Sequence, residues 1–197
     1  MVIPYGSVRS MALRPRLSRE DWTSAALRVM GERGVGGVAV EPLARSLGAT
    51  KGSFYWHFRD RDELIAATLE RWEQEETDAV IDMLRPLDDP RARLRQLVET
   101  IFLAQAEVPD RSVGIASDFG HPAVAEVLAR VSYRRIGYVA EQLVALGVEP
   151  VEARHRALLA YTSYLGYSTL VRSAPDAVPH GPETHAFLDS MVRLLTR

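Results

Sequence analysis

The sequence predicts an all-α protein in which a small helical head at the N-terminus precedes a larger helical body. Apolar residues recur at three- and four-residue steps through successive segments, as they do on the buried face of a helix. Capping residues, prolines and glycines stand where those segments begin and end. No stretch alternates apolar and polar residues in the manner of a strand, and we find no internal repeat.

The composition is that of an ordinary globular chain. Of the 197 residues, 47% are hydrophobic and 25% are charged, which is enough apolar material for a sizeable core. The absence of cysteine excludes a disulfide framework, a thiolate nucleophile and a zinc site built on sulfur. Because no secretory pattern occurs and no window approaches about 20 apolar residues, we expect a cytoplasmic protein without a membrane span.

The charge is divided unevenly along the chain. The formal net charge is −2, but residues 1–59 hold nine arginines or lysines against four acids, a net charge of +5. The remainder therefore carries −7. This distribution indicates that only the N-terminal part approaches a polyanion.

The first predicted helix covers residues 19–33. Ser18 followed by Asp21 is a variant of the capping box, and four glycines within Gly31–Gly37 end the periodic pattern. Residues 1–16 have no helical or strand period, so we interpret them as a flexible arm. Its arginines either remain in solvent or reach nucleic acid.

Two short helices follow the glycines. Glu41-Pro42 has the residues of a first helical turn, with the proline at the first helical position, and Gly48 is expected to end this helix. Thr50 is a suitable N-cap for a helix that begins at Lys51. Phe54 and Phe58, four residues apart, should share its buried face. The remaining circumference would be the more exposed one, with Lys51, Ser53, Tyr55, Trp56 and His57.

A helix, a short turn containing glycine and a second helix form the arrangement of a helix-turn-helix. In such a unit the second helix lies in the major groove of DNA. A plain helical hairpin within an all-α core is the alternative, but it would leave Lys51, Tyr55 and Trp56 without a role. We therefore interpret residues 17–63 as a helix-turn-helix DNA-binding domain.

The DNA-binding domain of the TetR family of transcriptional regulators is similar to residues 40–64, V-E-P-L-A-R-S-L-G-A-T-K-G-S-F-Y-W-H-F-R-D-R-D-E-L. The resemblance extends over about residues 17–69, and Arg61 stands where the family usually has lysine. It implies phosphate contacts from Thr50, Tyr55 and Arg61, and groove contacts from Lys51, Ser53 and Trp56. The complete predicted DNA-binding set is Thr50, Lys51, Gly52, Ser53, Tyr55, Trp56, His57 and Arg61. From the residues alone, Tyr55 is alternatively half-buried, and His57 alternatively a structural hydrogen-bonding residue.

Residues 64–197 are expected to form the helical ligand-binding and dimerisation body. A long helix should start at Asp60 or Asp62 and end by Pro86, and the helices after it should cover about residues 90–108, 121–146 and 151–173, with a last one through Leu195. Residues 111–120 are short and interrupted by glycine. The last two helices resemble the family's dimer interface; alternatively, they close the core of a monomer.

No catalytic constellation, metal-binding cluster or cofactor motif occurs in the body, so we do not expect an enzyme. A pocket between its helices should be apolar with a few polar groups. Arg134 or Arg172 is a plausible anchor for an acid. The candidate ligand-binding residues are Trp72, Phe102, Phe119, Tyr133, Arg134, Tyr161 and Tyr164.

These observations together predict a homodimeric DNA-binding transcriptional regulator. We expect a repressor that acts on a palindromic double-stranded operator and responds to a small-molecule effector. The alternative is a helical small-molecule-binding protein or enzyme whose basic head binds acidic partners.

Overall fold

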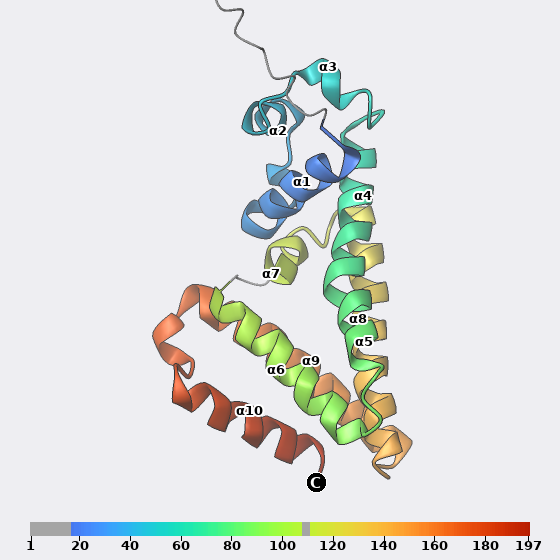
Figure 1. Cartoon of the computed structure of the whole chain (residues 1–197), viewed down its shortest axis with the longest axis vertical. Helices are drawn as coiled ribbons and strands as arrows, with labels where there is room; N and C mark the ends of the chain where they lie inside the picture. Colours follow the sequence, from blue (N-terminus) through green and yellow to red (C-terminus); the bar gives the residue numbers. More distant parts are fainter. Residues whose placement is uncertain (1–16, 108–110) are drawn as a thin grey trace, which may run out of the picture.

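The structure is a computed structural model that describes residues 17–107 and 111–197, so the arm expected at residues 1–16 lies outside the described residues (Figure 1). All regular elements of the described part are helical, which confirms the predicted fold class. In order they are α1 (Arg19–Arg33), η1 (Val35–Gly37), α2 (Val40–Ser46), α3 (Lys51–Phe54), α4 (Arg61–Glu73), η2 (Gln74–Asp78), α5 (Ala79–Leu84), α6 (Pro90–Glu107), α7 (Arg111–Ala116), α8 (Pro122–Ala145), α9 (Pro150–Ser173), η3 (Pro175–Ala177) and α10 (Pro182–Leu195).

The first helix has its predicted bounds. The Ser18 hydroxyl accepts from the amide of Asp21 at 3.2 Å, and the Asp21 carboxylate accepts from the amide of Ser18 at 2.7 Å, so the capping box is complete. Gly34, at φ 69°, ends the helix in a conformation that disfavours a side chain.

The second helix begins earlier than the prediction from Glu41-Pro42. It starts at Val40, so Pro42 is its third residue and not its first. Pro42 is tolerated there because the amides of the first turn have no partner within the helix. Gly48, at φ 64°, follows the C-cap Leu47 and ends α2 as expected.

The long connecting helix contains a local irregularity. The sequence predicts one helix up to Pro86, and α4 and α5 do follow one another along the side of the molecule (Figure 1). Between them, Gln74–Asp78 forms a π-helical turn (η2). Such turns hold one extra residue and are frequent at functional sites.

The body is a set of helices packed around α8. The α8 helix lies against α9 along much of its length and also contacts α4 and α6, while α10 packs on α6 and α9. The short α7 lies between head and body and contacts α1, α8 and α9 (Figure 1). Within the described ranges, no helix is both long and apolar enough to cross a bilayer.

The main hydrophobic core does not stop at the end of the head. It joins Trp22, Phe54 and Phe58 of the head to Leu69 and Trp72 of α4. It also includes Ile115 of α7 and Val124, Val127 and Val131 of α8. Head and body are therefore packed as one unit here, and movement in α4 or α7 must change contacts in the head.

Candidate functional site

The four-residue helix α3 is fixed at its start by the predicted cap. The Thr50 hydroxyl accepts a hydrogen bond from the amide of Ser53 at 3.2 Å. A helix of one turn has little stability of its own, so its position depends on packing. The predicted start at Lys51 is confirmed.

Two phenylalanines provide that packing. Phe54 and Phe58 are fully buried, with ring centroids 5.5 Å apart, and the ring of Trp22 meets Phe54 edge-on at 5.4 Å. Their predicted place in the core is confirmed. Because they hold one side of the α3 segment against α1, the opposite side faces solvent.

The solvent-facing side carries most of the predicted DNA-binding residues. Lys51, Gly52 and Tyr55 are exposed, and Trp56 is 79% exposed, an unusual state for so large an apolar side chain. Thr50 is exposed as well, while Ser53 and His57 are partly covered. Tyr55 is 56% exposed, and its ring meets that of Phe54 edge-on at 5.2 Å, so part of the ring is covered while the rest faces solvent. Thr50, Lys51, Gly52, Tyr55 and Trp56 are thus exposed together within one short segment of the chain.

Lys51 is held by an acid of the preceding helix. Its Nζ lies 3.0 Å from a carboxylate oxygen of Glu41, and both side chains are largely exposed. The hydrogen bond raises the pKa of Lys51 and lowers that of Glu41. Lys51 therefore stays charged, but a phosphate or base edge must compete with Glu41 for it.

Arg61 has a structural role in this head. Its Nε donates to the carbonyl oxygen of Val38 and its Nη2 to that of Val35, both at 2.7 Å. The first residue of α4 thus ties down the turn that leads into α2. A phosphate contact from Arg61 would have to use the part of the guanidinium that remains exposed.

The body contains an apolar cavity between η2, α5, α6, α8, α9 and α10. Its empty volume is about 720 Å³, part of which is open to solvent. Aliphatic side chains dominate the wall, among them Val80, Ile81, Leu94, Leu97, Val98, Ile101, Val139, Met191 and Leu195. A predominantly apolar wall with a few polar groups is typical of small-molecule sites.

The prediction of lining residues is met only in part. Phe102, Tyr161 and Tyr164 line the cavity. Trp72 is fully buried beside it, and Arg134 is paired with Asp78 at 3.1 Å outside the lining. The expectation for Phe119 and Tyr133 is wrong, because they are 73% and 80% exposed and do not line the cavity. Aromatic content alone did not show which way these side chains face.

The polar lining residues escaped the sequence prediction. They are Glu76, Thr77, Arg135 and Tyr138. Arg135 directly follows Arg134, and adjacent helical residues point about 100° apart. Here Arg135 lines the cavity, while Arg134 pairs with Asp78 outside it. Arg172, the other suggested anchor, instead donates to the carbonyl oxygen of Gly31 in α1 at 3.1 Å.

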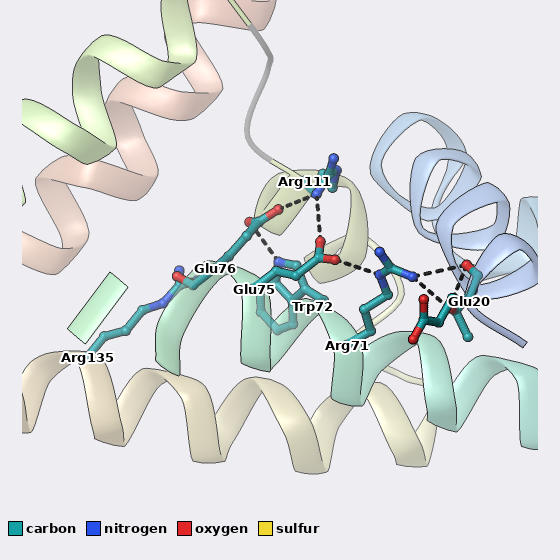
Figure 2. Close-up of polar contacts among 8 residues, drawn as sticks. Glu20, Arg71, Trp72, Glu75, Glu76, Arg111 and Arg135 are labelled. Atoms are coloured by element: carbon teal, nitrogen blue, oxygen red, sulfur yellow. Dashed lines mark hydrogen bonds and ion pairs between the residues drawn. The ribbon is translucent and has the colours of Figure 1, made fainter. Parts of the chain in front are cut away.

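A chain of polar contacts connects the cavity wall to the head (Figure 2). Arg135 donates to the carbonyl oxygen of Glu76 at 3.0 Å, and the Glu76 carboxylate accepts from Arg111 of α7 at 2.9 Å and from the indole of Trp72 at 2.9 Å. Arg111 also lies 3.7 Å from the carboxylate of Glu75, and this contact extends the chain to Arg71. Arg71 pairs with Glu75 at 2.6 Å and donates to the carbonyl oxygen of Glu20 in α1 at 3.0 Å.

Comparison with known proteins identifies the head. Residues 23–68 match the family described as bacterial regulatory proteins, tetR family. The HTH-type transcriptional regulator AcrR of Shigella flexneri is 33% identical over 61 residues, which cover 31% of this chain and 27% of AcrR. The class D tetracycline repressor of Escherichia coli is 36% identical over 52 residues, covering 26% of this chain and 24% of the repressor. The chain thus spans well under two thirds of these curated relatives.

The similarity to solved structures extends over nearly the whole chain. A TetR-family regulator from Agrobacterium tumefaciens superposes with a TM-score of 0.75 at 16% identity, covering 91% of this chain and 97% of that one. AibR, in complex with isovaleryl coenzyme A and operator DNA, superposes with a TM-score of 0.67 at 18% identity, covering 90% of this chain and 97% of AibR. FadR of Bacillus subtilis, in complex with stearoyl-CoA, superposes with a TM-score of 0.67 at 14% identity, covering 91% of this chain and 98% of FadR. At these identities the likeness establishes a shared fold.

Proposed function

Because the chain carries the N-terminal domain of the tetR family of bacterial regulatory proteins, we propose that it is a DNA-binding transcriptional regulator acting as a homodimer. In this proposal it represses transcription from a palindromic operator until a small-molecule effector binds in the body. In the same proposal, residues 17–63 form the DNA-binding domain and residues 64–197 the ligand-binding and dimerisation body.

The observation that carries the proposal is the surface of α3. An exposed lysine on the one-turn helix α3 is followed by an exposed tyrosine and tryptophan in the next turn, and Phe54 and Phe58 fix the other side of this segment. Phosphate contacts use hydroxyl groups, cations and helix N-termini, all of which Thr50, Lys51 and Tyr55 supply. The small Gly52 is exposed, and a β-carbon there would meet the Thr50 hydroxyl oxygen at 3.6 Å, so its lack of a side chain lets a groove wall approach closely.

A second copy of the chain would cover the outer faces of the last two helices. Leu158, Leu159 and Leu170 of α9 and Leu194 of α10 are exposed large apolar residues. Apolar surface of this kind on two adjacent helices is typical of an interface. Pairing them across a two-fold axis gives two heads, which must lie about 34–36 Å apart to enter successive major grooves.

The cavity is the proposed effector site. Its apolar wall supports the binding of a small molecule, and its polar connection to α1 supports an influence of that molecule on the head. The ligands of AibR and FadR support a small-molecule effector in a body of this fold. An effector shifts the equilibrium only by its difference in affinity for the two states of the dimer.

Binding to the DNA upstream of its own gene tests the proposal. We expect retention of that fragment over an unrelated fragment of equal length, with a steep loss as salt rises. Lys51→Ala and Tyr55→Ala should weaken binding while the dimer stays intact by size-exclusion chromatography. Equal, weak affinity for both fragments would favour a ligand-binding protein or enzyme without an operator.

A further inference from the structure

The polar lining residues of the cavity form one group and are not scattered over its wall. The Nε of Arg135 donates to the Thr77 hydroxyl at 2.9 Å and Nη2 to the carbonyl oxygen of Glu76 at 3.0 Å. The Ser112 hydroxyl lies 3.4 Å from Nη1. The rest of the lining is largely aliphatic or aromatic. A molecule that fills the cavity therefore meets mainly apolar contacts, with one guanidinium in the wall.

Arg135 lacks a counter-ion in the part of the chain that the structure describes. Its three hydrogen-bond acceptors are all neutral, and the rings of Trp72 and Tyr164 stand 5.4 Å and 5.8 Å from its guanidinium carbon. A partly buried cation without an opposite charge is incompletely compensated for lost hydration.

The nearest acids are already engaged. The Glu76 carboxylate accepts from Arg111 and from the Trp72 indole, and Asp78 pairs with Arg134. The positive charge of Arg135 therefore remains available to a ligand. The negative charge of Glu76 is offset by Arg111.

A second donor lies one turn further along α8. The Tyr138 hydroxyl oxygen is screened from solvent and, among the described residues, has no hydrogen-bond partner. Burial raises the pKa of Tyr138, so its hydroxyl keeps its proton and can donate. Three residues apart on one helix, Tyr138 and Arg135 share a face, and both line the cavity.

We propose that the cavity binds an apolar molecule carrying one carboxylate, that Arg135 binds the carboxylate, and that Tyr138 adds a second hydrogen bond. This inference rests on the proposed function in that the bound molecule is the effector. A carboxylate matches the guanidinium fork in a bidentate geometry and supplies the missing charge. It also competes with Thr77 and the Glu76 carbonyl group for the same N–H groups, so ligand binding acts directly on the π-helical turn.

Calorimetric titration with octanoate and octanol tests the assignment, because the two probes share an apolar chain and differ in the charged end. The wild-type protein should bind octanoate about tenfold or more tightly than octanol. Arg135→Gln should remove that preference while leaving octanol binding unchanged. Arg134→Gln is the matched control, since it removes the neighbouring arginine outside the cavity, and it should keep the preference.

Several results would overturn the proposal. These are equal binding of octanol and octanoate by the wild type, an unchanged preference in Arg135→Gln, and tight binding of octanoyl-CoA with weak binding of octanoate. If Arg135→Gln fails to fold, the wild type alone decides: its preference must vanish as pH falls through the range in which octanoate becomes protonated. Retention of upstream DNA by the ligand-free protein, measured on the same samples, separates failure of this inference from failure of the proposed function.

Discussion

Arg111 of α7 donates a hydrogen bond to the carboxylate of Glu76 at 2.9 Å and thereby joins the helix beneath the head to the π-helical turn at the cavity. The aliphatic part of the Arg111 side chain also packs against Gly31, near the end of α1. One residue thus contacts both the head and a cavity-lining segment. A change in η2 has a short mechanical path to α1 that does not run along the whole of α4.

Arg111→Met should weaken the coupling between effector and DNA. Methionine keeps much of the packing against Gly31 but cannot bond the Glu76 carboxylate. We expect ligand-free DNA affinity to change little. The factor by which octanoate lowers DNA affinity should be about five- to tenfold smaller in Arg111→Met than in the wild type. Gel-shift titrations without and with octanoate measure this factor. Arg85→Met is the control, because Arg85 is the exposed C-cap residue of α5. An unchanged factor would exclude Arg111 from the path.

Gly114→Ala should disturb the contact between α7 and α1. A β-carbon there would lie 2.1 Å from the carbonyl oxygen of Gly31, and backbone atoms cannot yield as a side-chain end can. We expect a loss of about 2–3 kcal/mol in the free energy of unfolding. Gly137→Ala in α8, where the added carbon meets nothing within 4 Å, should be neutral or stabilising by up to about 1 kcal/mol. Denaturant unfolding of both variants compares them, and equal effects would contradict the close approach.

The sequence predicted the head better than the body because short-range chemistry determines the head. Ser18, Thr50 and Gly48 act on amides and carbonyl groups within a few residues of themselves, so their roles are readable from spacing. The burial of Phe54 and Phe58 follows from the helical period alone. The contacts of Arg61 were harder to predict, because its partners Val35 and Val38 lie more than 20 residues away in the chain.

Predicting the cavity lining required information that the helical periodicity of the sequence does not contain. The π-helical turn Gln74–Asp78 shifts the facing of later residues by one position, while the apolar spacing still looks helical. Tyr133, Arg134 and Arg135 are consecutive, and only packing of α8 decides that Arg135 faces inward. For the same reason Gly114 looked like an interruption, although its missing side chain is what admits α1.

Glu41→Gln should strengthen DNA binding. The Glu41 carboxylate holds Lys51 at 3.0 Å and places a negative charge beside the proposed interface. Removing that charge frees Lys51 for DNA, so we expect affinity to rise about two- to fivefold at low salt and the gain to shrink as salt screens it. A gel-shift series against salt measures this. In a Lys51→Ala background most of the gain should disappear; a full gain there would show that Glu41 acts independently of Lys51.

Glu73 should make stability sensitive to acid. Its carboxylate accepts three contacts of 2.6–3.1 Å from Arg130 of α8, and this hydrogen bonding lowers the pKa of Glu73 below its ordinary 4.5. The stabilisation is complete above that ordinary value and is lost as pH falls through the lower pKa of the folded state. Glu73→Gln should therefore cost about 1 kcal/mol near neutral pH and progressively less in acid. Thermal unfolding against pH measures the difference, with exposed Glu32→Gln as the control; a pH-independent difference would exclude the ion pair as its cause.

Leu159→Asp should dissociate the proposed homodimer. Leu159 is 65% exposed at the centre of α9, beside Leu158 and on the face that a second copy would cover. A carboxylate at this position would be desolvated in the dimer without a partner, which we expect to weaken association about 100-fold or more. Phe119→Asp is the matched control, since Phe119 is a similarly exposed apolar residue that lies outside α9 and α10. Sedimentation analysis over a range of concentrations should show a monomer for Leu159→Asp and a dimer for the wild type and Phe119→Asp.

Operator affinity should fall with the loss of the dimer, because two linked heads bind two half-sites far more tightly than one head binds one. A dimer that survives Leu159→Asp would place the interface elsewhere on the molecule.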